Sequence, residues 1–165
     1  MAYADYTFYT ERYFGNIIPE ADFPRLSERA SDFIDTLTFD RLVDGLPTNE
    51  RAATKVQKAV CAVTEALYQI GLAEQQALSA ASGTSKQTGV MAGTTGVITS
   101  KSSGSESISY ASPSELAGSA KEWSAVYAAA GDAEKTNKLL AGAAIPYLSG
   151  VTTDEGVCLL YAGIG

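Results

Sequence analysis

The 165-residue sequence contains no histidine and only two cysteines, Cys61 and Cys158. The absence of histidine removes the commonest general base and the commonest metal ligand. Two isolated cysteines make neither a zinc-binding spacing nor a disulfide framework, which favours a reducing compartment. Serine is frequent, but the sequence has no G-x-S-x-G motif and no G-x-x-x-x-G-K-[ST] phosphate loop. We therefore expect a protein that is not an enzyme and has no cofactor.

Positive charge and long apolar runs are also scarce. Lysine and arginine number 12 against 19 acidic residues, giving a net charge of −7. This balance argues against tight binding to duplex DNA or to an anionic membrane, because phosphate binding needs clustered Lys and Arg. No apolar run approaches the ~20 residues of a membrane helix, and we expect no signal peptide at the start.

Apolar residues that recur every three or four positions dominate the sequence and predict a mainly α fold. One helix is expected to start after Asp22, a good N-cap, with Pro24 in its first turn. A longer helix is expected to start after Thr48 or Asn49 and to run to about Ser82. The predicted inward-facing residues of these two helices are Phe23, Leu26, Ala30, Phe33, Ile34, Leu37, Ala53, Val56, Val60, Val63, Leu67 and Ile70.

Two more helices are predicted in the second half of the chain. Ser112, Pro113 and Glu115 form a capping box before the third helix, and Asp132 caps a fourth that Pro146 weakens. A chain of this length fits one domain with its own core. We predict a single domain over 1–165, roughly a four-helix bundle, with a helical core at about 22–82 and 113–149, an arm at 83–112 and an extended C-terminal tail at 150–165.

The arm is rich in Gly, Ser and Thr, a composition typical of a flexible linker. It also contains VITSKSSGSESISY, which we predict to fold as a β-hairpin around residues 102–105. The facing pairs would be Val97 with Tyr110, Thr99 with Ile108, and Lys101 with Glu106. Because an isolated ribbon is barely stable in water, we interpret it as a projecting arm that becomes ordered against a neighbour.

Three carboxylates, Glu28, Asp32 and Asp35, lie on one side of the first long predicted helix. Such a cluster could hold a divalent metal. Arg25 and Arg29, however, precede Glu28 and Asp32 at i,i+3 spacing, which favours a solvated face with weak ion pairs. We therefore expect no metal site here.

Both ends of the sequence concentrate apolar side chains. TERYFG is predicted to form a single helical turn that Thr10 caps and Gly15 ends, and the tail closes with GVCLLYAGIG. A monomeric protein seldom leaves such surface open, so the pattern favours a subunit completed by neighbours. The alternative is that the ends are buried by the chain itself, either in its own helical core or by pairing with each other on the surface of the bundle. The N-terminal aromatic residues are Tyr3, Tyr6, Phe8, Tyr9, Tyr13 and Phe14.

Three stretches also carry a family resemblance. These are YTERYFGNIIPEADFPRLSERASDFIDTLTFDR, then ATKVQKAVCAVTEALYQI, then YLSG followed by GVCLLYAGIG. In their order and spacing they resemble the head–tail connector (adaptor) proteins of long-tailed bacteriophages and prophages. The tail departs from the family pattern in two places, with extra residues between YLSG and LLY and with Ala162 at a position where arginine is usual.

The resemblance implies a structural protein of the virion neck, assembled in the host cytoplasm. Family members form a ring, generally dodecameric, that joins the portal protein to the next neck or tail-completion protein. Packaged DNA passes through the ring without sequence-specific binding. The alternatives are a neck stopper or tail-completion protein, or a DNA-packaging factor such as a small terminase subunit.

Three groups of contact residues follow as expectations from this reading. The portal-binding candidates are Val157, Leu159, Leu160 and Tyr161. The subunit–subunit candidates are Tyr6, Phe8, Tyr9, Val97, Ile108 and Tyr110. The candidates for facing the DNA channel are Glu28, Asp32 and Asp35.

Overall fold

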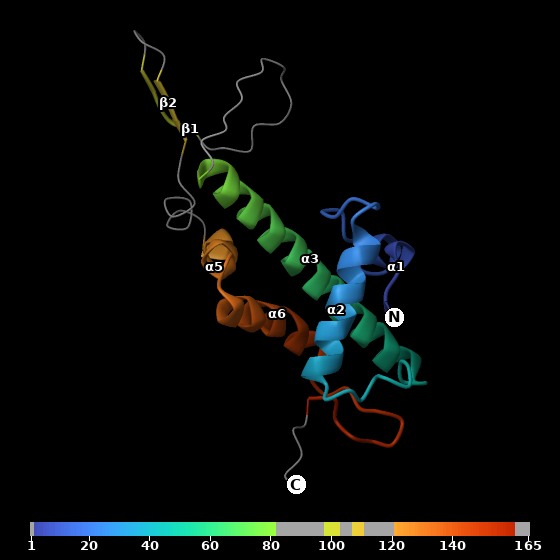
Figure 1. Ribbon diagram of the computed structural model, residues 1–165. Helices are drawn as coiled ribbons and strands as arrows, with labels where there is room; N and C mark the ends of the chain where they lie inside the picture. The colour runs from blue at the N-terminus through green and yellow to red at the C-terminus, as the bar shows by residue number, and fades with distance from the viewer. Residues whose placement is uncertain (1, 82–97, 103–106, 111–120, 161–165) are drawn as a thin grey trace. The chain divides into compact units, whose positions relative to one another are not determined.

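The computed structural model describes residues 2–81, 98–102, 107–110 and 121–160, which are mainly helical (Figure 1). The predicted mainly α class is confirmed. Contacts divide the chain into two compact units: unit 1 contains residues 1–69 and 137–165, and unit 2 contains residues 70–136. The single domain and the four-helix bundle stay predictions. In the part of the chain that the structure describes, no helix is long and apolar enough to cross a membrane.

The first helix of unit 1, α1 (Tyr6–Glu11), starts earlier than the sequence predicted. Its N-cap is Asp5, whose Oδ1 accepts a hydrogen bond from the Phe8 amide (2.7 Å). That bond satisfies an amide that the first turn leaves without a helical partner. The predicted cap, Thr10, is inside the helix, and its hydroxyl donates to the Tyr6 carbonyl (3.1 Å).

The second helix, α2 (Phe23–Leu37), follows the prediction closely. Asp22 occupies the N-cap position, although its side chain makes no capping bond. The sequence pattern missed two buried serines, Ser27 and Ser31, on the same face. Ser27 Oγ donates to the Ala4 carbonyl (2.7 Å), and Ser31 Oγ accepts from the Tyr3 amide (3.0 Å). The confirmed buried apolar residues are Phe23, Leu26, Ala30 and Ile34.

The long helix α3 (Glu50–Ala81) contributes to both units. Of the two predicted caps, the structure uses Asn49, whose Oδ1 accepts from the amides of Arg51 (3.0 Å) and Ala52 (3.2 Å). Cys61 is fully buried on this helix, as expected of a small apolar residue. Burial, with the nearby negative charge of Glu65, raises the pKa of its thiol to about 12.

Unit 2 holds the end of α3, α5 (Lys121–Ala129) and the first residues of α6 (Ala133–Leu148). Tyr127 connects two of these helices, because its hydroxyl donates to Gln76 Oε1 (2.7 Å). The predicted cap of α6 is confirmed, since Asp132 Oδ1 accepts from the amides of Glu134 (3.1 Å) and Lys135 (3.2 Å). These bonds and the Lys135 ammonium at 3.1 Å lower the pKa of Asp132. The predicted capping box at Ser112 lies outside the described residues.

Strands β1 (Ile98–Ser102) and β2 (Ser107–Tyr110) of unit 2 pair in antiparallel fashion, but not in the predicted register. Lys101 lies opposite Ile108 and Ile98 lies opposite Tyr110, so the predicted Val97–Tyr110, Thr99–Ile108 and Lys101–Glu106 pairs are wrong. The register also shifts between Ile98 and Ser100, so the two strands do not pair through one constant offset. An apolar alternation assumes a constant offset and therefore cannot indicate an irregularity of that kind.

Candidate functional site

The N-terminal aromatic residues pack inside unit 1. Tyr9 is fully buried, and its ring centroid lies 4.9 Å from that of Phe23 on α2. Its hydroxyl donates to Glu65 Oε1 on α3 (2.8 Å) and accepts from the amide of Ile17 (3.1 Å). Tyr9 is therefore not available as a subunit contact, and the alternative that this end packs against the chain's own helices is confirmed for it. Tyr6 and Phe8 are half-buried.

The ionisation of this aromatic cluster follows from its burial. Burial raises the pKa of Tyr9 to about 12, although the hydrogen bond from the Ile17 amide partly opposes the increase. Burial and the negative charge of Glu65 also raise the pKa of Tyr13, whose hydroxyl lies 3.3 Å from Glu65 Oε2. At neutral pH both phenols are therefore protonated and donate to the same Glu65 carboxylate. We interpret these hydrogen bonds as structural.

Gly15 gives a direct test of this packing. A Cβ atom at position 15 would overlap the ring of Tyr9, which is fully buried. Gly15→Ala should therefore lower the free energy of unfolding by about 1–3 kcal/mol, measured by urea denaturation with circular dichroism.

A matched control is Gly142→Ala in α6, where an added Cβ meets nothing within 4 Å. That variant should be stabilised by roughly 0.5–1 kcal/mol, because alanine loses less backbone freedom than glycine. In a Tyr9→Ala background, the effect of Gly15→Ala should disappear, since the clashing ring is gone. An equal loss in both backgrounds would contradict the proposed overlap.

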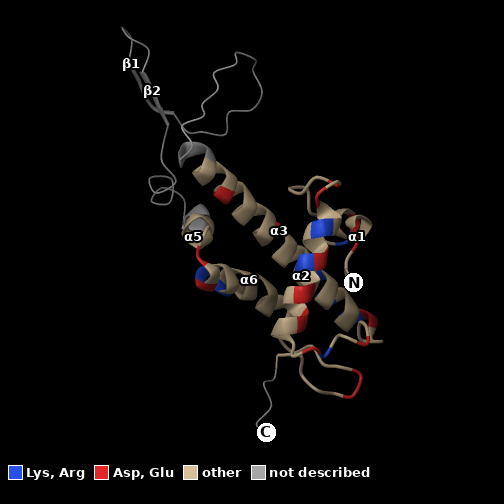
Figure 2. Cartoon of the chain, viewed as in Figure 1, with Lys and Arg blue, Asp and Glu red and all other residues tan. Residues whose placement is uncertain are grey.

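Acidic and basic residues both occur along α2 (Figure 2). Glu28 and Asp32 are exposed, whereas Asp35 is half-buried and accepts a hydrogen bond from the Tyr3 hydroxyl (2.6 Å). Among the residues that the structure describes, no group of His, Cys, Asp or Glu could hold a metal ion. Asp35 thus has a structural partner, and the channel-facing role of the three carboxylates stays a prediction.

The C-terminal tail folds back on unit 1. The Leu159 amide donates to the Val151 carbonyl (2.9 Å), and the Thr153 amide donates to the Val157 carbonyl (2.8 Å). A turn at Gly156, with φ of +84°, permits this reversal of direction. Leu159 is fully buried, so its prediction as a portal-contacting side chain is wrong: it packs in the chain's own core.

The remaining portal-binding candidates differ in exposure. The Val157 side chain is 38% exposed, and Leu160 is half-buried. Tyr161 lies outside the described residues. Among the predicted subunit contacts, Val97 also lies outside them. Ile108 and Tyr110 are on β2, opposite Lys101 and Ile98 respectively.

The loop after α2 was not predicted as a site. Phe39 and Asp40 both have left-handed backbone, with φ of +58° and +57°. Phe39 is 54% exposed and Val43 is 74% exposed. The Arg41 guanidinium lies 5.3 Å from the centre of the Phe39 ring, and its Nη1 donates to the Leu159 carbonyl (3.0 Å). The only sign of this loop in the sequence is that no glycine follows the helix until Gly45, although glycine is the usual residue at a left-handed helix end.

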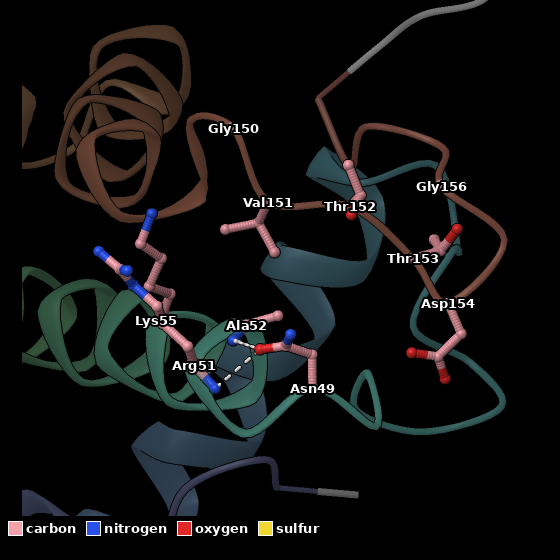
Figure 3. Close-up of a pocket in the computed structure, with 10 residues that line it drawn as sticks. All are labelled: Asn49, Arg51, Ala52, Lys55, Gly150, Val151, Thr152, Thr153, Asp154 and Gly156. Carbon is pink, nitrogen blue, oxygen red and sulfur yellow. Dashed lines mark hydrogen bonds between the residues drawn. The ribbon is translucent and has the colours of Figure 1, made fainter.

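A pocket of about 490 Å³ lies between the start of α3 and residues 150–156 (Figure 3). Arg51 and Lys55 line one side of it (Figure 3). On the other side, Asp154 accepts hydrogen bonds from the amide and the hydroxyl of Thr48 (both 2.9 Å). The two cationic side chains could bind an anion, while the bonds from Thr48 attach the tail to the start of α3.

Comparison with known proteins gives no family assignment. No protein-family model, curated protein or solved structure matches the chain. The candidate site is therefore defined by geometry within unit 1, where the loop after α2 and the C-terminal tail meet at Arg41.

Proposed function

We propose that this chain is a subunit of a bacteriophage head–tail connector ring, which joins the portal protein to the next neck or tail protein. The proposal is supported by the positions of the three stretches that resemble head–tail connector proteins. These stretches correspond to α1, α2, the first part of α3, the end of α6 and the tail, and nearly all of their residues belong to unit 1. Segments that are separated in the sequence thus belong to one packed unit, as a shared fold requires.

Exposed apolar side chains give the proposal further support. Phe39 and Val43 are more than half exposed, and Ile17 and Val157 are partly so. A connector subunit contacts its neighbours in the ring through two different surfaces and contacts the portal through a further one, so it needs several contact surfaces. The buried aromatic terminus does not contribute, because Tyr9 is inside unit 1.

The proposed roles of the other segments follow the ring arrangement. The tail contacts the portal through Val157, Leu160 and Tyr161. The ribbon formed by β1 and β2 is an arm that packs against a neighbouring subunit, and the helices form one bundle-like domain within the ring. The acidic side chains Glu28 and Asp32 face passing DNA, where their charge keeps the duplex from binding.

Mass measurement by light scattering tests the function. The purified chain is measured alone and then mixed with the portal protein encoded in the same gene neighbourhood. We expect a complex containing a ring of this chain on the portal. Two components that keep their separate masses under all mixing ratios would contradict the proposal. Binding to a downstream neck protein without binding to the portal would indicate a stopper or tail-completion protein instead.

A further inference from the structure

The loop after α2 holds its backbone in a conformation that its residues disfavour. The amide of Asp40 donates to the carbonyl of Asp35 (2.9 Å), a bond that ends the helix in a tight turn. The turn places Phe39 and Asp40 in the left-handed region. Glycine is usual at such a helix end, because any Cβ there crowds the neighbouring carbonyl. A bulky aromatic at position 39 is therefore not explained by the need to end the helix.

Contacts on several sides keep this loop in place. Leu42 is buried, and its carbonyl oxygen lies 2.9 Å from the Tyr3 hydroxyl. Arg41 stacks over the Phe39 ring and donates to the carbonyls of Cys158 (3.2 Å) and Leu159 (3.0 Å). The exposed side chains of the loop are thus held outward by a fixed backbone.

From this geometry we propose that Phe39 and Val43, together with Val157 of the adjoining tail, form the surface that docks onto the portal protein. The inference rests on the proposed function. It assigns portal contact to these exposed side chains in place of Leu159, which is buried. Strained backbone that persists because its surroundings hold it is characteristic of functional positions. A large aromatic side chain on a rigid support loses little freedom on binding and is the usual anchor of an interface.

The charges around the loop define the partner surface. Asp40 and Asp44 are exposed beside Phe39 and Val43, while the Arg41 guanidinium is directed at the tail carbonyls. The complementary surface is an apolar recess edged by lysine or arginine. A second copy of this chain is a poorer match, because its net charge is −7, with 19 acidic residues against 12 basic ones.

Two matched glycine variants test the docking surface. Phe39→Gly removes the aromatic side chain and also relieves the left-handed backbone, so its unfolding midpoint should be unchanged or higher. Its dissociation constant for the portal protein should rise about tenfold or more. Phe14→Gly is the control, because Phe14 is also exposed and has φ of +62°. It should fold equally well and bind the portal as the wild-type chain does.

A third variant tests the charge argument. Asp40→Asn with Asp44→Asn keeps the side-chain shapes, and it should slow association and reduce its dependence on salt. If the wild-type chain binds the portal protein and Phe39→Gly binds it equally well, the docking surface is overturned and the proposed function stays intact. Equal losses in Phe39→Gly and Phe14→Gly would also overturn it, because the effect would not belong to the loop. A wild-type chain that binds no portal would instead remove the proposed function itself.

Discussion

Tyr9→Ala should lower the free energy of unfolding of unit 1 by about 3–5 kcal/mol, the range for removing a fully buried aromatic side chain. Tyr9 has no exposed surface, and its ring packs on Phe23 and Tyr13, with centroids 4.9 Å and 5.9 Å away. Truncation would leave a cavity between α1 and α2 and remove the hydrogen bond to Glu65. Urea denaturation followed by far-ultraviolet circular dichroism measures the change.

Tyr9→Phe separates the ring from the hydroxyl. The ring packing remains, but the Glu65 carboxylate and the amides of Ile17 and Ile18 lose their shared partner. A buried polar group left without its partner costs about 1–3 kcal/mol. We therefore expect Tyr9→Phe to fall between wild type and Tyr9→Ala. If both variants unfold at the wild-type urea concentration, the aromatic cluster is not part of the core.

The helices could be predicted from the sequence because their signals are local. The buried face of α2 is set by apolar residues at helical spacing, and Phe23 and Ile34 are buried as expected. Asn49 and Asp132 cap α3 and α6 through bonds to amides only two or three residues away. Such features depend on neighbouring residues and not on the tertiary fold.

The candidate site could not be predicted in the same way. An apolar residue near a chain end looks the same whether its own helices or another subunit cover it, and the structure assigns Tyr9 and Leu159 to the first case. Ser27 and Ser31 were missed because their partners, the carbonyl of Ala4 and the amide of Tyr3, are distant in sequence. The left-handed backbone at Phe39 runs against the preference of its residue type, so no propensity indicates it.

Leu159→Ala should lower the free energy of unfolding of unit 1 by about 2–5 kcal/mol, because the side chain is fully buried and its loss leaves a cavity. The surrounding main-chain bonds, from the Leu159 amide to Val151 and from Arg41 to the Leu159 carbonyl, limit how far the tail can collapse into that space. Urea denaturation measures the loss, and hydrogen exchange at residues 151–159 shows whether the tail detaches first.

Val157→Ala is the matched control, because Val157 is 38% exposed on the same turn. Its effect on stability should stay within about 0.5 kcal/mol, while portal binding falls if Val157 belongs to the docking surface. The two variants therefore separate two roles of one tail: Leu159 fastens it to unit 1, and Val157 meets the partner. Deleting residues 156–165 would remove both at once, so weaker binding by that truncated chain could arise from unfolding alone. Stable folding of Leu159→Ala would contradict the fastening role, and unchanged binding by Val157→Ala would exclude the tail from the contact.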